Sequence, residues 1–365
     1  MIRAVLTNEI LNYITEIDKN RYAVSSVSLP KTVANKLRKN SKKKSSYAST
    51  KIEGNPLTEQ QSDEVIESDA RRHYLRPEQE VRNYYLALTY LEECAAKKER
   101  FSKKLILAVQ KYVEKGAPKT KIGLRGPMPP GVLFAVYDSE TGKPDYIPPE
   151  YKDVPDLLDE LVAYVNTTDD HPLIVSAVVH YQLVTIHPFE DGNGRTARLL
   201  SGYILDINGY GFGGIGSLEE YFAYDIQEYY DSIQMGLSVH YYNGRNNPPH
   251  PEIWINYFLR MVLLYSGKVR DLSLHSGSEA LENALSHLNN KEKDLLLYLI
   301  NNHKGTFSPI EVSRVLGVTN KTIINRLAAL VKNGFVAPNM AQERIRSYEL
   351  TDYTKQRAKE IRKQL

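Results

Sequence analysis

Residues 187–198 read His187-Pro-Phe-Glu-Asp-Gly-Asn-Gly-Arg-Thr-Ala-Arg198 and connect two apolar segments, Pro172–Ile186 and Arg195–Ile207. Both segments have the composition of buried helices. Two glycines flank Asn193, so the backbone can turn its N–H groups toward one point. These groups open onto the second helix, whose free N–H groups and positive dipole end attract phosphate. The stretch therefore predicts an anion-binding loop between two buried helices.

The side chains of this loop suit a reaction at a polyphosphate. Arg195 and Arg198 are three residues apart, so they share one helix face and can reach the same anion. Asp191 offers one carboxylate, and Mg²⁺ needs only one or two protein oxygens beside phosphates and water. His187 can act as a general base, because an ordinary histidine is largely neutral near pH 7. Each feature alone is a common turn or surface pattern, but the combination is specific.

The complete stretch resembles the signature of the Fic family, enzymes that transfer the AMP part of ATP to a protein hydroxyl. The resemblance implies that His187 deprotonates a Ser, Thr or Tyr hydroxyl and that Asp191 holds Mg²⁺. It also implies an ATP-binding set, which consists of Gly192, Asn193, Gly194, Arg195 and Arg198. Attack at the α-phosphorus would release pyrophosphate, with catalysis mainly by alignment and charge stabilisation. Neither Gly-Lys pair in the chain is followed by the Ser or Thr of a P-loop.

A segment rich in Pro and Gly, residues 122–151, interrupts the helical pattern. It contains an apolar run at Val132–Tyr137, a turn-like stretch at 138–142 and a short extended piece at Asp145–Ile147, which together predict a β-hairpin. In the resembling enzymes a flap beside the active site pairs with the target chain by strand addition. The corresponding flap residues here would be Val132, Leu133, Phe134, Ala135 and Val136. The Trp-Ile-Gly often found in that flap is absent.

Tyr229 and Tyr230 resemble the adenine side of the same family's site, where an aromatic ring offers a stacking face. The chain contains 26 tyrosines, so packing in the core is an equally good interpretation of this pair.

A second short motif, Ser49-Thr-Lys-Ile-Glu53-Gly54-Asn55, resembles the family's inhibitory helix. The resemblance implies that Glu53 pairs with Arg198, removes a γ-phosphate ligand and so prevents ATP from aligning. Ser49 lies one helical turn before Glu53 and could steady this contact by a hydrogen bond. The competing interpretation is a surface glutamate that precedes the helix-terminating Gly54.

Composition excludes several classes of protein. The 365 residues carry a net charge of +3 and are too many for one ordinary core, so two or three domains are expected. The one cysteine, Cys94, cannot form an internal disulfide or a cysteine-rich zinc site. No apolar stretch is long enough to span a bilayer, and the N-terminus lacks the pattern of a signal peptide. These observations predict a cytoplasmic protein that does not enter a membrane.

The C-terminal part is basic. Residues 291–365 contain 14 Lys and Arg against 7 Asp and Glu, a net charge of +7. Their pattern predicts three helices, with a tight turn at Leu316–Asn320 between the second and third, followed by two extended runs. This order is typical of a winged helix-turn-helix domain. Such a domain could dock DNA or a protein, and both remain open.

The fold class predicted from these patterns is mainly α, a Fic-type helical bundle with a β-hairpin flap followed by a winged helix-turn-helix domain. The expected domains are an N-terminal helical region at 1–100, a catalytic core at 101–270 and the winged helix at 284–365. We expect a linker at Gly267–Asn283 and one helix over Leu218–Leu237. The basic cluster Lys36–Lys44 is interpreted as a solvated connection.

The leading functional hypothesis is an autoinhibited protein adenylyltransferase that uses Mg²⁺ and ATP and modifies a protein hydroxyl, including hydroxyls of its own chain. A second hypothesis is a DNA-binding regulator that senses a nucleotide without turning it over, although sensing would not need the base His187. Transfer of a different phosphate-linked group is a third. Removal of AMP from a target, with Glu53 orienting a water, is a fourth. A homo-oligomer is also left open.

Overall fold

The computed structural model describes residues 2–68, 74–116, 122–137, 142, 144–235, 242, 248–341 and 344–365. Within them the chain divides into two compact units, one of residues 1–21 and 37–268, the other of residues 22–36 and 269–365. None of the helices in this part of the chain combines the length and apolar character that a bilayer crossing requires.

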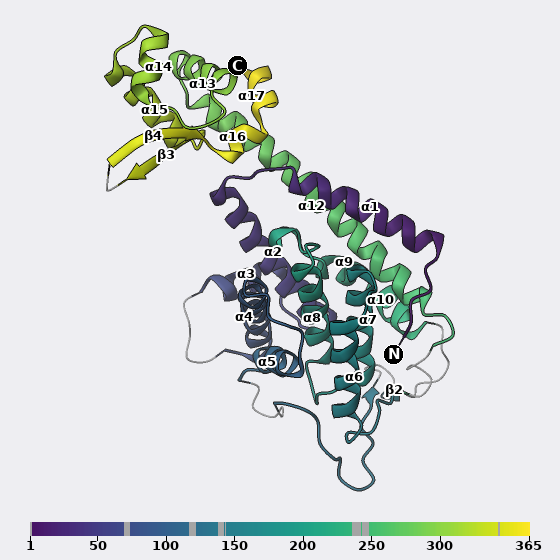
Figure 1. Ribbon diagram of the computed structural model, residues 1–365. Helices are drawn as coiled ribbons and strands as arrows, with labels where there is room; N and C mark the ends of the chain where they lie inside the picture. Colours follow the sequence, from purple (N-terminus) through teal and green to yellow (C-terminus); the bar gives the residue numbers. More distant parts are fainter. Residues whose placement is uncertain are drawn as a thin grey trace. The chain divides into compact units, whose positions relative to one another are not determined.

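The first unit is a helical bundle (Figure 1). Three of the described helices are shared with the second unit: α1 (Asn8–Ser25), α2 (Lys31–Ile52) and α12 (Glu252–Ser286). The others lie wholly within the first unit: α3 (Glu59–Glu67), α4 (Arg76–Ala96), α5 (Lys103–Val113), α6 (Val154–Thr167), α7 (Pro172–Ile186), α8 (Asn193–Ile207), the short 3₁₀ turn η1 (Phe212–Gly214), α9 (Glu219–Tyr224) and α10 (Ile226–Gln234). The predicted mainly helical fold is confirmed.

Helices α7 and α8 form the centre of this bundle (Figure 1). Almost every residue of α7 is buried, as its continuous apolar sequence predicts. Helices α4 and α5 pack against α8, and α6 packs against α7. The core that joins them includes Leu105, Leu158, Val179 and Leu200, each with no exposed surface. This packing fixes the ends of α7 and α8, between which the 187–198 loop runs.

The predicted hairpin is confirmed but is shorter than expected. Strand β1 (Val136–Tyr137) pairs with β2 (Pro144–Tyr146) in antiparallel orientation. Residues 132–135, the first part of the apolar run, are not in a strand. Residues 138–141 of the expected turn lie outside the described residues.

The second unit contains the C-terminal helices α13 (Asn290–Asn302), α14 (Pro309–Leu316), α15 (Asn320–Lys332), α16 (Asp352–Gln356) and α17 (Ala358–Gln364). Strands β3 (Val336–Ala341) and β4 (Arg344–Leu350) form an antiparallel hairpin. The unit has its own core, which draws Leu281 and Leu285 from the end of α12. The order helix, helix, turn, helix, hairpin agrees with the pattern that the sequence predicts.

Two local expectations about helix bounds are wrong. The stretch Gly267–Asn283 is not a linker, because α12 continues through it without a break to Ser286. The segment Leu218–Leu237 does not form one helix. Asp225 leaves the helical conformation and its side chain accepts the N–H of Glu228, which starts α10. The last two positions of that segment, 236 and 237, lie outside the described residues.

The basic cluster Lys36–Lys44 is also not a connection, because it lies inside α2. Lys43 is only 8% exposed and pairs with Asp63 and Glu67 of α3. Lys42 pairs with Glu92, and Lys44 pairs with Glu220. Acidic residues on neighbouring helices neutralise the lysines and so stabilise this helix. These acidic partners are distant in sequence, so the local sequence does not reveal them.

Candidate active site

His187 ends helix α7 in the left-handed conformation, with φ of 48°. Non-glycine residues rarely adopt this conformation, and it often marks a functional position. The backbone N–H of His187 still donates to Leu183 O at 3.1 Å. Ring atom Nδ1 lies 3.2 Å from Val184 O. Because a carbonyl can only accept, Nδ1 carries the proton and Nε2 keeps the lone pair that a general base needs.

The pKa of His187 is lowered to about 4, mainly because burial disfavours the charged ring, with a further contribution from the positive charge of Arg125. The carbonyl of Val184 and the carboxylates of Glu53 and Asp191 act in the opposite direction. His187 is therefore neutral at physiological pH.

The loop after His187 is held in shape by its own side chains. Asn193 is 4% exposed, and its amide exchanges two hydrogen bonds of 3.0 Å with the backbone of Phe189. Gly192 has φ of 80° and precedes the first turn of α8. The side-chain amide of Asn193 is thus engaged within the loop, which leaves the backbone of Gly192–Gly194 as its contribution to anion binding.

Arg125 anchors the beginning of the loop from the segment before the hairpin. Its Nε donates to His187 O at 2.9 Å, and its backbone N–H donates to Pro188 O at 2.9 Å. Its guanidinium group also lies 4.7 Å from the ring centre of Phe134. Burial lowers the pKa of Arg125, but the group stays charged at neutral pH.

Arg198, on the second turn of α8, is 2% exposed and contacts helix α2. Its Nη2 atom lies 2.5 Å from Glu53 Oε1. Nε donates to Ser49 Oγ at 2.8 Å, and Nη2 donates to the Ser49 carbonyl at 2.9 Å. A single inward-facing arginine therefore joins α8 to the end of α2. The structure brings together the three residues Ser49, Glu53 and Arg198, which are up to 149 positions apart in sequence.

The Glu53 carboxylate also rests on the first turn of α8. A Cβ atom placed on Gly194 would lie 2.4 Å from Glu53 Oε1 and 3.3 Å from Arg198 Nη1. Glycine is thus required at position 194 for the carboxylate to approach the backbone. Gly54, which follows with φ of 82°, ends the α2 segment immediately beyond this contact. An internal carboxylate occupies the anion-binding position that the loop sequence predicts.

Arg195 faces away from Arg198, toward the end of α5. Its Nη2 atom lies 2.9 Å from Glu114 Oε1 and 3.1 Å from Asp191 Oδ1. The side chains of Arg195 and Glu114 are 4% and 3% exposed, so this is a buried ion pair. Arg195 and Arg198 thus contact different carboxylates, and their joint binding of one anion stays a prediction.

Asp191 is held between two cations. Its Oδ1 contacts Arg195, and its Oδ2 lies 3.0 Å from Nη2 of Arg76, at the start of α4. Arg76 is itself bound by Glu80, and its side chain is 64% exposed. A half-exposed carboxylate with one outward oxygen fits Mg²⁺ bound mostly through phosphate oxygens and water. The described residues contain no group of three His, Cys, Asp or Glu that would hold a metal on its own.

The two tyrosines of the proposed adenine side differ sharply. Tyr229 is 1% exposed, and its hydroxyl lies 2.8 Å from His180 Nε2 and 3.4 Å from Arg198 Nη1. Aromatic side chains, including Trp254, surround its ring, so Tyr229 has no open face for a base. Tyr230 is 40% exposed, and its hydroxyl donates to Ile52 O at 3.3 Å. Of the pair, only Tyr230 offers an accessible ring.

Of the residues predicted to form the flap, Phe134 lies beside the start of the loop. Val132 and Leu133 are about half exposed, and the ring centre of Phe134 lies 6.0 Å from that of His187. Ala135 leads into β1, which starts at Val136. The apolar run thus contains two half-exposed side chains, Val132 and Leu133, followed by Phe134, which lies beside His187.

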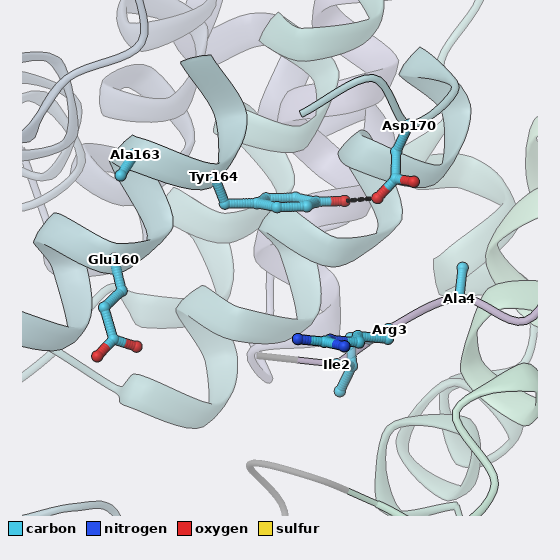
Figure 2. Close-up of a pocket in the computed structure, with 7 residues that line it drawn as sticks. All are labelled: Ile2, Arg3, Ala4, Glu160, Ala163, Tyr164 and Asp170. Carbon is cyan, nitrogen blue, oxygen red and sulfur yellow. Dashed lines mark hydrogen bonds between the residues drawn. The ribbon is translucent and has the colours of Figure 1, made fainter. Parts of the chain in front are cut away.

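A separate pocket, shown in Figure 2, lies where the N-terminal segment passes α6. It is lined by Ile2, Arg3, Ala4, Glu160, Ala163, Tyr164 and Asp170. The Tyr164 hydroxyl donates to Asp170 Oδ2 at 2.7 Å, which closes one side. None of the lining residues belongs to the 187–198 loop or to the end of α2.

Residues 100–205 match the family model described as Fic/DOC family, and this range contains α5 to the end region of α8 with the complete loop between α7 and α8. The chain contains a Fic-family domain. The curated relatives include the proteins named "Protein adenylyltransferase Fic" of Drosophila mojavensis and Aedes aegypti, which are 28% and 29% identical over 204 and 202 residues. These matches cover 54% and 53% of this chain but only 38% of each relative.

Solved Fic structures share the fold. A Fic family protein from Desulfovibrio desulfuricans G20 superposes with a TM-score of 0.57 at 22% identity, over 96% of this chain and 98% of that one. Fic-1 from C. elegans (residues 134–508) superposes with a TM-score of 0.56 at 23% identity, over 74% and 73% of the two chains. At these identities the similarity establishes the fold.

Sequence reasoning missed three side chains that support the Fic loop: Arg76, Glu114 and Arg125. Arg76 and Glu114 lie on α4 and at the end of α5, and Arg125 lies in the segment before the hairpin. Each is between 62 and 115 positions from its partner in the loop. No motif surrounds them, and a single charged residue in an amphipathic helix normally indicates a solvated surface.

Proposed function

We propose that this chain is a protein adenylyltransferase that moves AMP from ATP to the hydroxyl of a protein side chain. The observation that carries the proposal is the carboxylate of Glu53 on Arg198 and against Gly194, beside a neutral histidine. A carboxylate in this position is an internal substitute for a phosphate oxygen, so the site is built to bind an anion next to a base. The adenylyltransferase names of the curated relatives support the same activity.

In the proposed reaction Nε2 of His187 accepts the proton of the target hydroxyl while the hydroxyl oxygen attacks the α-phosphorus of ATP. The bond between the α-phosphorus and its bridging oxygen breaks, and pyrophosphate leaves with that oxygen. The N–H groups of Gly192–Gly194 and the guanidinium of Arg198 hold the phosphates in line. Asp191 would hold Mg²⁺, which supplies charge neutralisation for the phosphates when it is bound.

The hairpin is proposed to position the target. The main chain of 132–135 precedes β1 and carries the half-exposed Val132 and Leu133, and Phe134 lies close to His187. An extended target segment that pairs with this backbone would bring a hydroxyl toward the histidine without strong dependence on its sequence.

Glu53 is proposed to inhibit the enzyme. While Glu53 pairs with Arg198, the arginine cannot contact the γ-phosphate, and the carboxylate fills the space above Gly194. ATP then binds without the alignment that attack requires. Removal of the Glu53 side chain would free both groups.

The test is intact-mass analysis of the purified protein after incubation with Mg²⁺ and ATP, alone and with an added mixture of hydroxyl-containing proteins. We expect AMP adducts to form slowly with the native chain, at least about tenfold faster with Glu53→Gly, and not at all with Glu53→Gly/His187→Ala, since loss of a general base commonly reduces rates by about 10²–10⁴. Absence of adducts from Glu53→Gly would reject the proposal. A mass increase other than that of AMP would indicate transfer of a different phosphate-linked group.

The second unit is proposed to be a winged-helix docking module. Its α14 and α15 are joined by a short turn, and Asn320 and Lys321 are exposed at the start of α15. With the net charge of +7 in residues 291–365, this helix suits a polyanion. A mobility-shift assay with random duplex DNA at low salt distinguishes DNA binding from protein docking.

A further inference from the structure

Glu114 is a buried carboxylate for which the proposed reaction has no use. It follows α5 directly, and only 3% of its side chain is exposed. Its backbone is fixed on both sides, because Asn83 donates from Nδ2 to the carbonyls of Val113 at 2.9 Å and Lys115 at 2.8 Å. Burial raises the pKa of the Glu114 carboxyl, and the charge of Arg195 opposes that effect. A carboxylate in such a place is retained only with a specific partner.

That partner is Arg195, which is equally buried. The Nη2 atom of Arg195 lies 2.9 Å from Glu114 Oε1, which is an ion pair without hydrogen-bond geometry. Within the described residues, Glu114 Oε1 and the Nε and Nη1 atoms of Arg195 have no hydrogen-bond partner. Glu114 therefore places a buried negative charge beside the guanidinium group, whose hydrogen bond goes to Asp191. The pair of Glu114 and Arg195 also has no net charge, so the Arg195 guanidinium does not cancel the negative charge of Asp191.

The carboxylate also lies directly against the loop. A Cβ atom on Gly192 would be 2.7 Å from Glu114 Oε1 and 3.0 Å from Val113 Cγ1. Gly192 has φ of 80°, which already favours glycine. The close approach of Glu114 is a second reason why this position of the loop has no side chain.

Arg195 connects this pair to Asp191. The same Nη2 atom lies 3.1 Å from Asp191 Oδ1, so Glu114, Arg195 and Asp191 form one chain of contacts from the end of α5 to the loop. Asp191 Oδ1 also accepts the backbone N–H of Gly192 at 2.6 Å. Asp191 Oδ1 is therefore held by Arg195 and by the backbone of Gly192, and Oδ2 is the oxygen directed toward the exposed Arg76.

We propose that Glu114 is a positioning residue for the nucleotide-bound metal. Through Arg195, Glu114 holds Asp191 with Oδ2 outward. It also offsets the positive charge of Arg195, so that Asp191 still attracts a cation. This inference rests on the proposed function. If Glu114 becomes neutral, Arg195 keeps its charge and has Asp191 as its remaining carboxylate partner in this chain of contacts. The attraction of Asp191 for a divalent cation then decreases.

The experiment measures Mn²⁺ binding by electron paramagnetic resonance in the presence of a non-hydrolysable ATP analogue. All variants carry Glu53→Gly, so that the internal carboxylate does not interfere. Glu114→Gln keeps the size of the side chain and removes its charge, and Glu114→Asp keeps the charge on a shorter side chain. The matched control is Glu219→Gln, since Glu219 is also a buried carboxylate, 8% exposed, but its partners are the hydroxyls of Ser45, Tyr84 and Ser217.

We expect Glu114→Gln to weaken Mn²⁺ binding by about tenfold or more, the range typical of residues that orient a metal ligand, with Glu114→Asp intermediate. Glu219→Gln should lower the unfolding temperature without changing Mn²⁺ affinity. Unchanged affinity in a folded Glu114→Gln protein overturns the inference. Should that variant not fold, Glu114→Asp decides in the same way.

The outcomes separate this inference from the proposed activity. If the Glu53→Gly parent binds Mn²⁺ and nucleotide but transfers no AMP, the adenylyltransferase proposal fails while the role of Glu114 stands on the binding data. If the parent binds no Mn²⁺ with the nucleotide analogue, the role of Glu114 is rejected, because there is then no metal to position.

Discussion

Two hydrogen bonds join Arg198 to Ser49: Nε donates to the hydroxyl at 2.8 Å, and Nη2 donates to the carbonyl at 2.9 Å. Ser49 has no exposed surface. The serine therefore holds the guanidinium in the orientation in which it meets Glu53. The contact proposed to inhibit the enzyme is thus an arrangement of three residues, in which the Ser49 hydroxyl contributes beside the ion pair.

Ser49→Ala removes one of these two bonds and leaves the carbonyl. We expect AMP transfer to rise by about fivefold, because a lost hydrogen bond of about 1 kcal/mol loosens the closed arrangement without abolishing it. The increase should be smaller than that of Glu53→Gly. The control is Ser46→Ala, since Ser46 is equally buried on the same helix but donates to Lys42 O. Equal rates for the two serine variants would remove Ser49 from the inhibitory contact.

Arg76 pairs with Oδ2 of Asp191 and would therefore compete with a cation that binds there as proposed. Arg76→Gln should lower the Mg²⁺ concentration that gives half-maximal AMP transfer by up to about fivefold, because an exposed ion pair is worth about 0.2–1 kcal/mol. The measurement is a Mg²⁺ titration in the Glu53→Gly background. Arg82→Gln, on the same helix, is the control, since Arg82 packs over Tyr74. A higher Mg²⁺ requirement in Arg76→Gln would instead make Arg76 a phosphate ligand.

The lowered pKa of His187 predicts an unusual pH profile. With a pKa of about 4 the imidazole is already neutral at pH 5.5, so kcat/KM should stay nearly constant from pH 7.5 to 5.5 and fall only toward pH 4. A histidine of ordinary pKa, about 6.5, would lose about tenfold over the same interval. The assay uses Glu53→Gly, which also removes a nearby negative charge that raises the pKa. A tenfold loss by pH 5.5 in folded protein would contradict the buried, neutral state of the ring.

Tyr229 and Tyr230 should respond differently to loss of the hydroxyl. Tyr229→Phe leaves His180 Nε2 without its 2.8 Å partner inside the core, so the free energy of unfolding should fall by about 1–3 kcal/mol. Tyr230→Phe loses only a 3.3 Å bond at a half-exposed position and should change it by less than about 0.5 kcal/mol. Chemical denaturation measures both. Equal effects would show that the Tyr229 hydroxyl is not a buried core contact.

Much of the helical framework was predictable. The bounds expected for α7, Pro172–Ile186, agree with the structure, because its continuous apolar run is a local property of the sequence. The helix–turn–helix order and the hairpin of the C-terminal unit were also predicted correctly. Where α12 and α2 were misjudged, charged and small residues obscured the period, and packing or ion pairs with other helices compensated for it.

The sequence by itself determined the twelve-residue loop, the histidine that begins it and the two arginines of α8, since a glycine-flanked turn onto a helix is encoded within a dozen neighbouring residues. Only the tertiary structure decided that Arg198 faces Glu53 while Arg195 faces Glu114. Both arginines lie on one helix, but Glu53 and Glu114 each follow the end of a different helix, more than 80 positions away in sequence. Both arginines are buried, and a charge removed from water must be neutralised by a nearby opposite charge. The distant carboxylates therefore determine which way each arginine points.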